Sequence, residues 1–593
     1  MTRFFIRGRL YNHNKVSDHD GAWCKRQFFS REWLRMNGLT LVCFSIVVFV
    51  CAYLFYGRWL VKTWGIEPDA KTPAFRFKDD KDFVPSSRFT VFAHQFSSIT
   101  GAGPVTGPII AAMFGWVPAF LWILVGGVFF GAVQDFTALY ASVKNDGKSM
   151  GKLIEQYVGK TGAQFFLMFA WLFCLIVIAA FSDIMASTFN GFSKTGAALG
   201  PNASAASISM IYIFVAMVFG VVTRHLHIHG AAEVVLGIVA MVVMIGLGIQ
   251  YPMFASRSTW LYVTYAYCFI ASILPMWLLI EPRDYLSVFL LLGMILAGVV
   301  GIVVANPTIT MPAFTSFTVG KQPLFPILFI TIACGAVSGF HSLVSSGTSS
   351  KTISNEKDML PVGYGAMLVE STLGVVSLVI AGSVAVNGQL PKATPFAIFG
   401  NAIGGYFTMF GIPQYVSTCI VTMCVSALAM TTIDAVTRIG RMVLQELLAP
   451  KEGHKQGAVA KFFSNTYVAT IATLIPSYLL CLGGYMNIWP LFGSANQLIS
   501  SLVLIALAVF LKATGRKSFM LYIPMTFMFI VTMSALCLTI YNIFVKLSAG
   551  SFVVMVDGLQ LVVALCLMFL AIMVVKNCTK ELFNSSAKPV PAK

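Results

Sequence analysis

The sequence predicts an all-α protein that crosses a membrane many times and in which two of the helices are broken. Hydrophobic residues make up 57% of the 593 positions and charged residues only 11%. This composition is typical of integral membrane proteins and excludes a large soluble domain. Two apolar stretches contain clustered glycine and hydroxyl residues, at 94–108 and 338–351. Glycine and proline free backbone groups from a helix, and inside a membrane those groups need partners in protein, water or a bound solute.

The lengths of the apolar stretches predict helices rather than strands. About 20 helical residues, at a rise of 1.5 Å each, span the ~30 Å hydrocarbon core of a bilayer. About 14–15 stretches of the chain meet this length. They begin near Gly38, Phe89, Trp116, Ala163, Ala206, Gly230, Trp260, Asp284, Leu324, Leu360, Gly411, Phe462, Trp489, Ser518 and Phe552.

The two broken segments divide these helices into two sets. Each set has seven helices and opens with one of the broken segments, at residues 89–323 and 324–576. Because seven is odd, the second set is expected to run inverted relative to the first, as in transporters built from inverted repeats. A core of five plus five helices with extra peripheral helices fits equally well. The other parts are a basic tail (1–37), a first hydrophobic span with a charged loop (38–88) and a C-terminal tail (577–593).

The net charge of +17 is spread over the short segments between the spans, so it indicates membrane orientation and contact with anionic lipids rather than nucleic-acid binding. Most Lys and Arg fall on the side of the loop at 144–160, which places that loop and the C-terminus in the cytoplasm. The first span is basic on both flanks. Three interpretations are open: the basic tail before this span lies outside the cell, the span does not cross the membrane in a simple way, or a further segment upstream changes the count of spans. Since the cysteines form no Cys-x-x-Cys pair, no zinc site or other metal site is expected.

The first broken segment reads His-Gln-Phe-Ser-Ser-Ile-Thr-Gly-Ala-Gly-Pro-Val-Thr-Gly-Pro over 94–108. An interior proline costs a helix about 3 kcal/mol and a glycine about 1 kcal/mol, so a break is expected here. The ends of half-helices offer N–H groups to anions and carbonyls to cations. A tight helix crossing on small residues is the competing interpretation. The candidate solute or ion ligands are His94, Ser97, Ser98, Thr100, Gly101, Gly103 and Thr106.

The second broken segment, 338–351, also combines glycine, hydroxyl groups and one histidine. An imidazole changes charge near neutral pH, so either segment's histidine is a candidate carrier of a coupling proton, against a purely structural role. These hydroxyl groups are expected either to coordinate a solute or to cap a helix. Lys351 is a candidate for a positively charged anchor on the cytoplasmic side. The candidate ligands are Ser338, Gly339, His341, Ser345, Ser346 and Thr348.

Several polar side chains fall inside other apolar stretches. Asp135, next to Gln134, and Glu370 lie within spans, where an unpaired charge costs several kcal/mol and therefore faces a partner or a cavity. Both are expected to belong to polar networks, and structural ion pairing is the alternative. Asn496 and Gln497 line the solute pathway or form hydrogen bonds between helices.

At these residues the chain resembles the carbon starvation protein A (CstA) family of bacterial inner-membrane transporters. The resemblance implies import of small carbon sources, with peptides and pyruvate as substrates, and distant kinship to the amino acid, polyamine and cation transporter superfamily. The matching segments are 82–85 (Asp-Phe-Val-Pro), 94–108, 131–136 (Gly-Ala-Val-Gln-Asp-Phe), 338–351, 368–370 (Leu-Val-Glu), 489–493 (Trp-Pro-Leu-Phe-Gly) and 496–497 (Asn-Gln).

The function these features favour is a secondary transporter driven by protons, whose partners are a small solute, the coupling ion and membrane lipids. A sodium-coupled symporter is the first alternative, and a membrane sensor of nutrient state is the second. The sequence lacks a Gly-x-x-x-x-Gly-Lys-Ser/Thr loop, which argues against direct ATP drive. No acid, base and nucleophile set stands out, so neither an enzyme nor a bound cofactor is expected.

Overall fold

The computed structural model describes residues 37–583 apart from 80–81, 194–195, 229, 276, 387, 392, 394 and 449–456. The basic tail expected at 1–37 lies almost wholly outside the described residues, as does the end of the tail expected at 577–593. The described part is almost entirely helical, and its strands are β1 (Thr318–Val319) and β2 (Gln322–Pro323), which pair antiparallel.

Helices follow one another along both halves of the chain. The first half comprises α2 (Gly38–Cys51), η1 (Ala52–Gly57), α3 (Arg58–Trp64), α4 (Pro73–Arg76), α5 (Arg88–Ile99), α6 (Gly103–Ala111), η2 (Ala112–Phe114), α7 (Trp116–Val125), η3 (Gly126–Gly131), α8 (Ala132–Lys144), α9 (Met150–Tyr157), α10 (Lys160–Thr188), α11 (Gly200–His225), α12 (Ala231–Gln250), α13 (Arg257–Ile273) and α14 (Ile280–Ala305). The second half comprises α15 (Leu324–Thr331), α16 (Gly339–Gly347), η4 (Ser349–Lys351), η5 (Glu356–Asp358), η6 (Leu360–Gly365), α17 (Ala366–Val384), α18 (Pro395–Met409), α19 (Gln414–Leu447), α20 (Ala458–Ser464), α21 (Thr466–Cys481), α22 (Tyr485–Ala513), η7 (Phe519–Leu521), α23 (Tyr522–Ser548), η8 (Val554–Gly558) and α24 (Leu559–Phe583).

Among the described residues, 11 helices are long and apolar enough to cross a membrane, which confirms the predicted multi-span helical fold. The other four predicted stretches are helical too, but they are broken or short. Two are the pairs α5–α6 and α15–α16, and the others are α13, with 17 residues, and α21, with 16. The sequence reading missed α18, because several glycines interrupt its apolar run.

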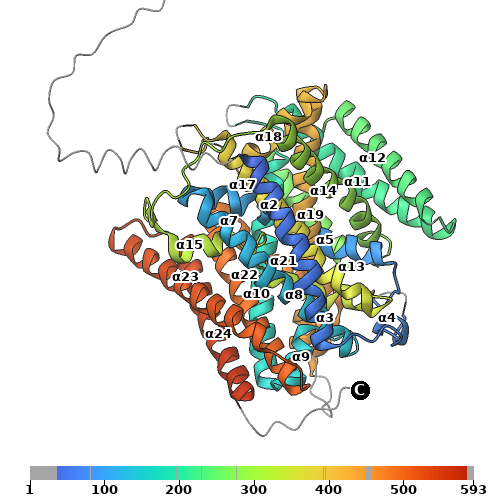
Figure 1. The fold of residues 1–593 in the computed structure, drawn as a ribbon, viewed down its shortest axis with the longest axis vertical. Coiled ribbons are helices and arrows are strands. Elements are labelled where there is room, and N and C mark those ends of the chain that lie inside the picture. Colours follow the sequence, from blue (N-terminus) through green and yellow to red (C-terminus); the bar gives the residue numbers. More distant parts are fainter. Residues whose placement is uncertain are drawn as a thin grey trace, which may run out of the picture.

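The long helices differ in how much of their surface other helices cover. The apolar window of α22 is 100% buried inside the protein, whereas that of α12 is 22% buried. In Figure 1, α11 and α12 lie along one side of the molecule and α23 and α24 along the other, with α10, α19 and α22 between them. The exposed apolar faces of the outer helices therefore suit contact with lipid, while α10, α19 and α22 form the protein core.

The two broken helices pack against each other in opposite directions. The first half of one, α5, contacts α16, the second half of the other, and α6 likewise contacts α15. The first break, at 100–102, falls within the predicted segment 94–108, and the second, at 332–338, lies directly before the predicted segment 338–351 and overlaps it at Ser338. Because each half contacts the opposite half of its counterpart, the two broken helices run antiparallel, as the inverted arrangement requires.

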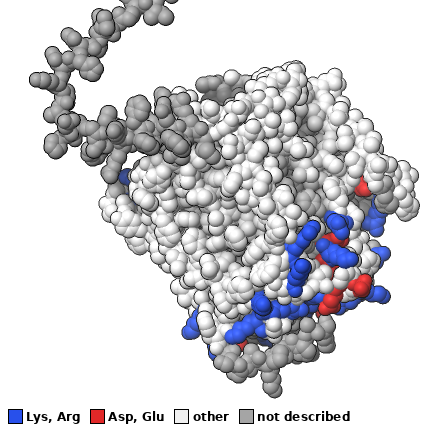
Figure 2. Space-filling model, in the orientation of Figure 1, with Lys and Arg blue, Asp and Glu red and all other residues white. Residues whose placement is uncertain are grey.

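Charged side chains gather at one end of the molecule. In Figure 2, Lys and Arg cluster at the end where α3, α4 and α9 lie in Figure 1, and the rest of the visible surface is largely uncharged. The first span runs towards this basic end. Its start, Gly38, donates a backbone hydrogen bond to Pro307 O at 2.9 Å, and at its other end Trp64 Nε1 donates to Lys517 O at 3.0 Å. The span is thus a continuous crossing whose start lies at the end opposite the loop at 144–160.

Replacing Gly339 by alanine is expected to destabilise the protein, because a Cβ there would lie 2.5 Å from both Asn496 O and Ser500 N of α22. Overpacking of this kind costs about 1–3 kcal/mol of folding free energy. Thermal unfolding of the purified protein in detergent measures the loss. The matched control is Gly347→Ala on the same helix, where a Cβ meets nothing within 4 Å. Equal melting temperatures for the two variants would contradict this packing.

Candidate functional site

Contacts within the protein occupy most of the break in the first helix. Ala102 O accepts both the backbone N–H of Thr106 at 3.0 Å and its hydroxyl hydrogen at 2.9 Å, so Thr106 reinforces the first turn of α6. A Cβ at Gly103 would lie 2.6 Å from Cys334 of the second break, so this glycine allows the two breaks to touch. The hydroxyls of Ser98 and Thr100 are buried and have no hydrogen-bond partner in the part of the chain that the structure describes. These two hydroxyls are free to bind a solute or an ion.

His94 connects three elements of the bundle. Its Nδ1 lies 2.7 Å from Asp284 Oδ2 on α14, and its Nε2 lies 2.9 Å from the Thr348 hydroxyl at the end of α16. Ser97, one turn further along α5, donates its hydroxyl hydrogen to Asp284 O at 3.1 Å. The first histidine is therefore the junction of α5, α14 and α16, which we call the His94 centre.

Gln95 extends the contact between α5 and α16. Its Nε2 donates to the Ser345 hydroxyl at 2.9 Å, and its Oε1 accepts from the Ser349 hydroxyl at 2.6 Å. All three side chains are fully buried. Gln95 thus connects α5 to α16 and to η4, which follows it, by two hydrogen bonds. The neighbouring His94 connects α5 to the end of α16 by one.

A buried arginine, Arg283, lies next to Asp284, the aspartate of the His94 centre. Arg283 forms an ion pair with Asp434 on α19, and its Nη2 lies 3.6 Å from Asp284 Oδ1. Tyr267 of α13 donates its hydroxyl hydrogen to Asp434 Oδ2 at 2.6 Å. The side chains of this network are at most 1% exposed, apart from the tyrosine at 8%. The arginine thus offsets part of the charge that two buried carboxylates bring into the interior.

The second histidine lies between two carboxylates. His341 Nδ1 is 3.0 Å from Asp135 Oδ2 of α8, and its Nε2 is 3.5 Å from Glu370 Oε2 of α17. All three side chains are fully buried. Within the described part of the chain, both Glu370 oxygens, Asp135 Oδ1 and His341 Nε2 have no hydrogen-bond partner. This group, which we call the His341 centre, has unused capacity to bind a proton or a cation.

Cys334 adds a thiol to the His341 centre. One ligand atom each from Cys334, His341 and Glu370 lies within 4.8 Å of the others, and all three residues are buried. Thiolate, imidazole and carboxylate are the ligands that zinc and related ions prefer in proteins. The set has the donor atoms for a metal ion, although the sequence reading expects no metal site.

Amide side chains of α22 hold the second broken helix in place. Asn496 Oδ1 accepts hydrogen bonds from the Ser338 hydroxyl and from Phe340 N, both at 3.1 Å, at the start of α16. Gln497 Nε2 donates to Phe329 O of α15 at 3.1 Å. The two amides therefore bridge both halves, which corresponds to the hydrogen-bonding alternative of the sequence reading.

Gln134 of α8 forms hydrogen bonds to both sides of the same contact, between the start of α16 and α22. Its Nε2 donates to Ser338 O at 2.6 Å, and its Oε1 accepts a hydrogen bond from Ser500 of α22. Ser346, by contrast, donates within its own helix, to Ser342 O at 2.8 Å. Among the predicted residues, the two centres contain His94, Ser97, Thr348, His341, Asp135 and Glu370. Gln134, Ser338, Asn496 and Gln497 instead hold the second broken helix against its neighbours, and the Ser346 hydroxyl makes a local helix contact.

Sequence reasoning missed several members of the two centres. The sequence predicts Asp284 as the start of a span rather than as a partner of His94, and it gives no role to Arg283. A signal is present, because the residues before the long apolar run, Glu281-Pro282-Arg283-Asp284, place charges in the first turns of α14. Charges at such positions need buried partners once the helix packs. The other missed residues are Gln95, Tyr267, Cys334 and Ser500.

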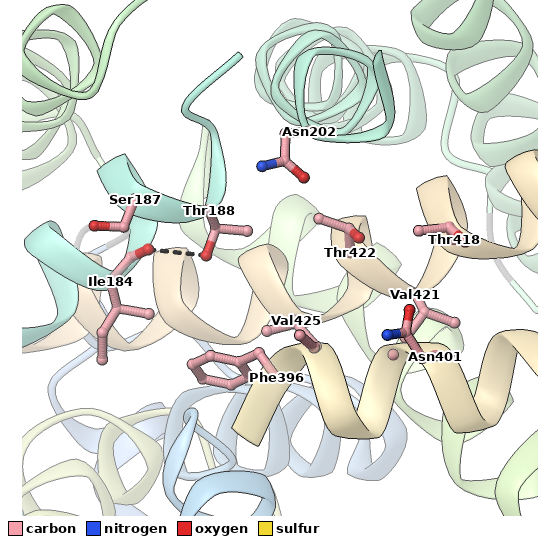
Figure 3. A pocket seen from close by; sticks show the side chains of 12 residues that line it. Ile184, Ser187, Thr188, Asn202, Phe396, Asn401, Thr418, Val421, Thr422 and Val425 are labelled. Carbon is pink, nitrogen blue, oxygen red and sulfur yellow. Dashed lines mark hydrogen bonds between the residues drawn. The ribbon is translucent and has the colours of Figure 1, made fainter. Parts of the chain in front are cut away.

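A separate cavity of about 270 Å³ lies at the end of the molecule opposite the basic end. Figure 3 shows its lining, which combines hydroxyl and amide groups with apolar side chains. Ser187 and Thr188 come from the end of α10, Asn202 from α11, and Thr418 and Thr422 from α19. None of these residues was predicted as a site residue. Their neutral polar groups suit hydrogen bonding to an uncharged part of a solute.

These features define a polytopic membrane protein with buried polar centres at two broken helices, an architecture found in secondary transporters. The family model described as "Carbon starvation protein CstA" matches residues 37–388 and 383–535. The chain belongs to the carbon starvation protein CstA family, which confirms the resemblance noted in the sequence.

Curated relatives cover most of the chain. "Peptide transporter CstA" of Escherichia coli strain K12 is 32% identical over 84% of this chain and 81% of its own. "Peptide transporter CstA" of Bacillus subtilis strain 168 is 32% identical over 91% of this chain and 96% of its own. "Pyruvate/proton symporter BtsT" of E. coli K12 is 30% identical over 88% and 84%. A solved manganese transporter of Eremococcus coleocola, at 11% identity, covers 85% of this chain and 99% of its own with a TM-score of 0.48, too low for an argument.

The buried ion pair predicts a measurable coupling between Arg283 and Asp434. Removing one member of a buried pair costs about 3–5 kcal/mol because the other charge is left uncompensated. Arg283→Met and Asp434→Leu are each expected to lower the unfolding temperature, and the double variant should lose less than the sum of the two. Lys152→Met is the control, since its pair with Glu155 is exposed and contributes at most about 1 kcal/mol. Strictly additive losses would contradict a direct pair.

Proposed function

We propose that the protein is a secondary-active transporter that imports small carbon sources, short peptides or pyruvate, coupled to protons. The observation that carries this proposal is the pair of buried His–carboxylate centres at the contact between the broken helices. The names of the relatives support it, since they describe peptide transport and pyruvate/proton symport. The solute, the coupling ion and membrane lipids are the partners in this proposal.

The His341 centre is the site that we assign to the coupling proton. With a neutral imidazole, its two carboxylates carry two negative charges in surroundings that stabilise them poorly. Binding a proton lowers their mutual repulsion and supplies a donor for the oxygens that have none. Because Asp135 is on α8, Glu370 on α17 and His341 on α16, a change in charge alters the attraction among three helices. Proton binding is thereby linked to the position of the broken helix.

The His94 centre gives the same link at the first broken helix. Its imidazole joins Asp284 to the Thr348 hydroxyl, so its charge and tautomer decide how strongly α5 is held to both α14 and the end of α16. In transporters with broken helices, solutes bind at the half-helix ends. The unpartnered hydroxyls of Ser98 and Thr100 at the break are the groups that we assign to the solute.

The basic end of the molecule is, in this proposal, the cytoplasmic face. Lys and Arg are enriched on cytoplasmic loops, and they gather at that end in Figure 2. The C-terminus then lies in the cytoplasm, and the membrane is the bacterial inner membrane. We further infer that residues 89–323 and 324–576 are inverted repeats and that the protein is a carrier rather than an enzyme. The antiparallel packing of the two broken helices supports the repeats.

Counterflow in proteoliposomes tests the transport function. Vesicles that hold the purified protein and unlabelled pyruvate are expected to accumulate labelled pyruvate, with di- and tripeptides as unlabelled competitors. Accumulation that peptides do not reduce indicates a carrier of small carboxylates. Peptide uptake without a pyruvate signal indicates a peptide carrier. Uptake of neither solute, while the protein remains folded, would contradict the transporter and leave the sensor of nutrient state.

The coupling ion is tested by changing one gradient at a time. Lower outside pH is expected to accelerate uptake, and a protonophore to abolish accumulation, because the proton gradient drives the solute. Replacing sodium by potassium at fixed pH should change nothing. A requirement for sodium at fixed pH would favour the sodium-coupled alternative.

The two histidines are expected to be required for coupled uptake. His94→Ala and His341→Ala should each reduce proton-driven accumulation by about tenfold or more, the effect of removing a positioned proton carrier. His225→Ala is the matched control, because His225 lies exposed at the end of α11. Accumulation at the normal level in the double His94→Ala/His341→Ala variant would rule out proton transfer through these centres.

A further inference from the structure

A second large cavity opens at the basic end of the molecule. It has a volume of about 690 Å³ and lies between the last turns of α19, the end of α13 and the start of α21. This volume is in the range of sites for small molecules. Its polar lining consists of Asp82, Arg438, Arg441, Gln445, Glu446 and Thr466. The proposed function above uses none of these residues.

The arginines of this cavity are incompletely partnered. Arg438 donates to Leu274 O, its Nη1 lies 3.8 Å from Asp82 Oδ1, and its Nε has no hydrogen-bond partner. Arg441 Nη1 donates to Ser272 O at 3.1 Å, and its Nε is buried without a partner. Arg438 is itself only 5% exposed. Each guanidinium therefore keeps a buried N–H that no group among the described residues accepts.

The nearby carboxylates do not fully neutralise the charges of these two arginines. Asp82, the partner of Arg438, has a side chain that is 43% exposed, so water weakens its attraction. Both oxygens of Glu446 accept from the Ser149 hydroxyl, at 2.8 and 2.9 Å. Among the described residues, no carboxylate lies within ion-pair distance of Arg441. A partly buried cation without a counter-charge is unfavourable, and an anion in the cavity would relieve it.

The cavity lies close to the His94 centre. Arg438 follows Asp434 by four residues on α19, which is about one helical turn. Asp434 pairs with Arg283, whose neighbour Asp284 holds His94. The cavity arginine Arg438 therefore lies about one helical turn from Asp434, on the basic side of the network that holds His94.

We propose that this cavity binds the carboxylate of the transported solute on the side where the solute is released, with Arg441 and Arg438 as its partners. A guanidinium recognises a carboxylate by paired N–H···O hydrogen bonds. This inference rests on the proposed transport function and adds to it a second, peripheral solute site. The phosphate of an anionic lipid or inorganic phosphate presents the same chemistry, and the experiment must separate these sources.

The test compares transport from the two sides of the membrane. Cells present the outer face of the protein, and inverted membrane vesicles present its basic face. Arg441→Gln is expected to raise the half-saturating pyruvate or peptide concentration in inverted vesicles by about tenfold or more, the effect of losing hydrogen bonds to a charged group. In cells the half-saturating concentration should stay at the wild-type value. An equal effect on both sides, an effect on the outer side alone, or no effect would overturn the proposal.

Controls separate this site from general damage. Arg76→Gln is the matched variant, because Arg76 is an exposed arginine at the same end, paired with Asp146, and it should behave as wild type from both sides. Arg441→Lys keeps the positive charge but loses the paired donors, so it should give an intermediate value. If Arg441→Gln does not fold, Arg441→Lys and Arg438→Gln carry the same comparison, and wild-type values in both would overturn the proposal.

Varying the lipid composition and the buffer identifies which anion the cavity binds. In proteoliposomes made without anionic lipid, the difference between Arg441→Gln and wild type should persist. A difference that requires phosphatidylglycerol would assign the cavity to a lipid headgroup and overturn the solute site. Inorganic phosphate should compete weakly with the solute, and competition that saturates below the solute's own half-saturating concentration would assign the cavity to phosphate. Wild-type protein that carries no solute would instead refute the proposed transport function.

Discussion

The junction of α5 with α16 is the interaction on which the rest of the structure depends. Two half-helices meet there through the His94–Thr348 and Gln95–Ser345 contacts, and all four side chains are buried. In apolar surroundings each of these polar groups needs a partner with matching geometry. His94 has a further partner on α14, Asp284, and His341 of α16 has partners on α8 and α17, so satisfying these groups determines how the three helices approach the broken pair.

The two centres differ in how they offset buried negative charge. Around His94, the two aspartates have a buried arginine, whose guanidinium pairs with Asp434 and lies 3.6 Å from Asp284. Around His341, two carboxylates share one imidazole, and among the described residues neither is paired with an arginine or lysine. In both centres some buried polar atoms have no hydrogen-bond partner among the described residues. The fixed positive charge therefore suits the first centre to holding the bundle, whereas the second centre has more to gain from a proton or cation.

Cavities at the two ends of the molecule have different chemistry. The cavity in Figure 3 offers neutral hydroxyls and amides, and the cavity at the basic end offers arginines. Between them lie the broken helices, packed so closely that Gly339 cannot carry a side chain without meeting the α22 backbone. In the proposed function, the broken helices shift when a solute passes between the ends, and charge changes at the histidine centres act on those helices.

The sequence by itself determined the membrane class, the positions of the long helices and both breaks, because hydropathy, length and glycine–proline content are local properties that the bilayer constrains directly. It also supplied most residues of the centres, such as His341, Asp135 and Glu370. It could not pair His94 with Asp284 or reveal Arg283 and Asp434 as partners, since these residues are separated by more than a hundred positions in the chain or were read as span ends. It also missed α18, where glycines lower the hydropathy. Only the tertiary structure decided those pairings, because the partner of a buried charge is set by which helices pack together.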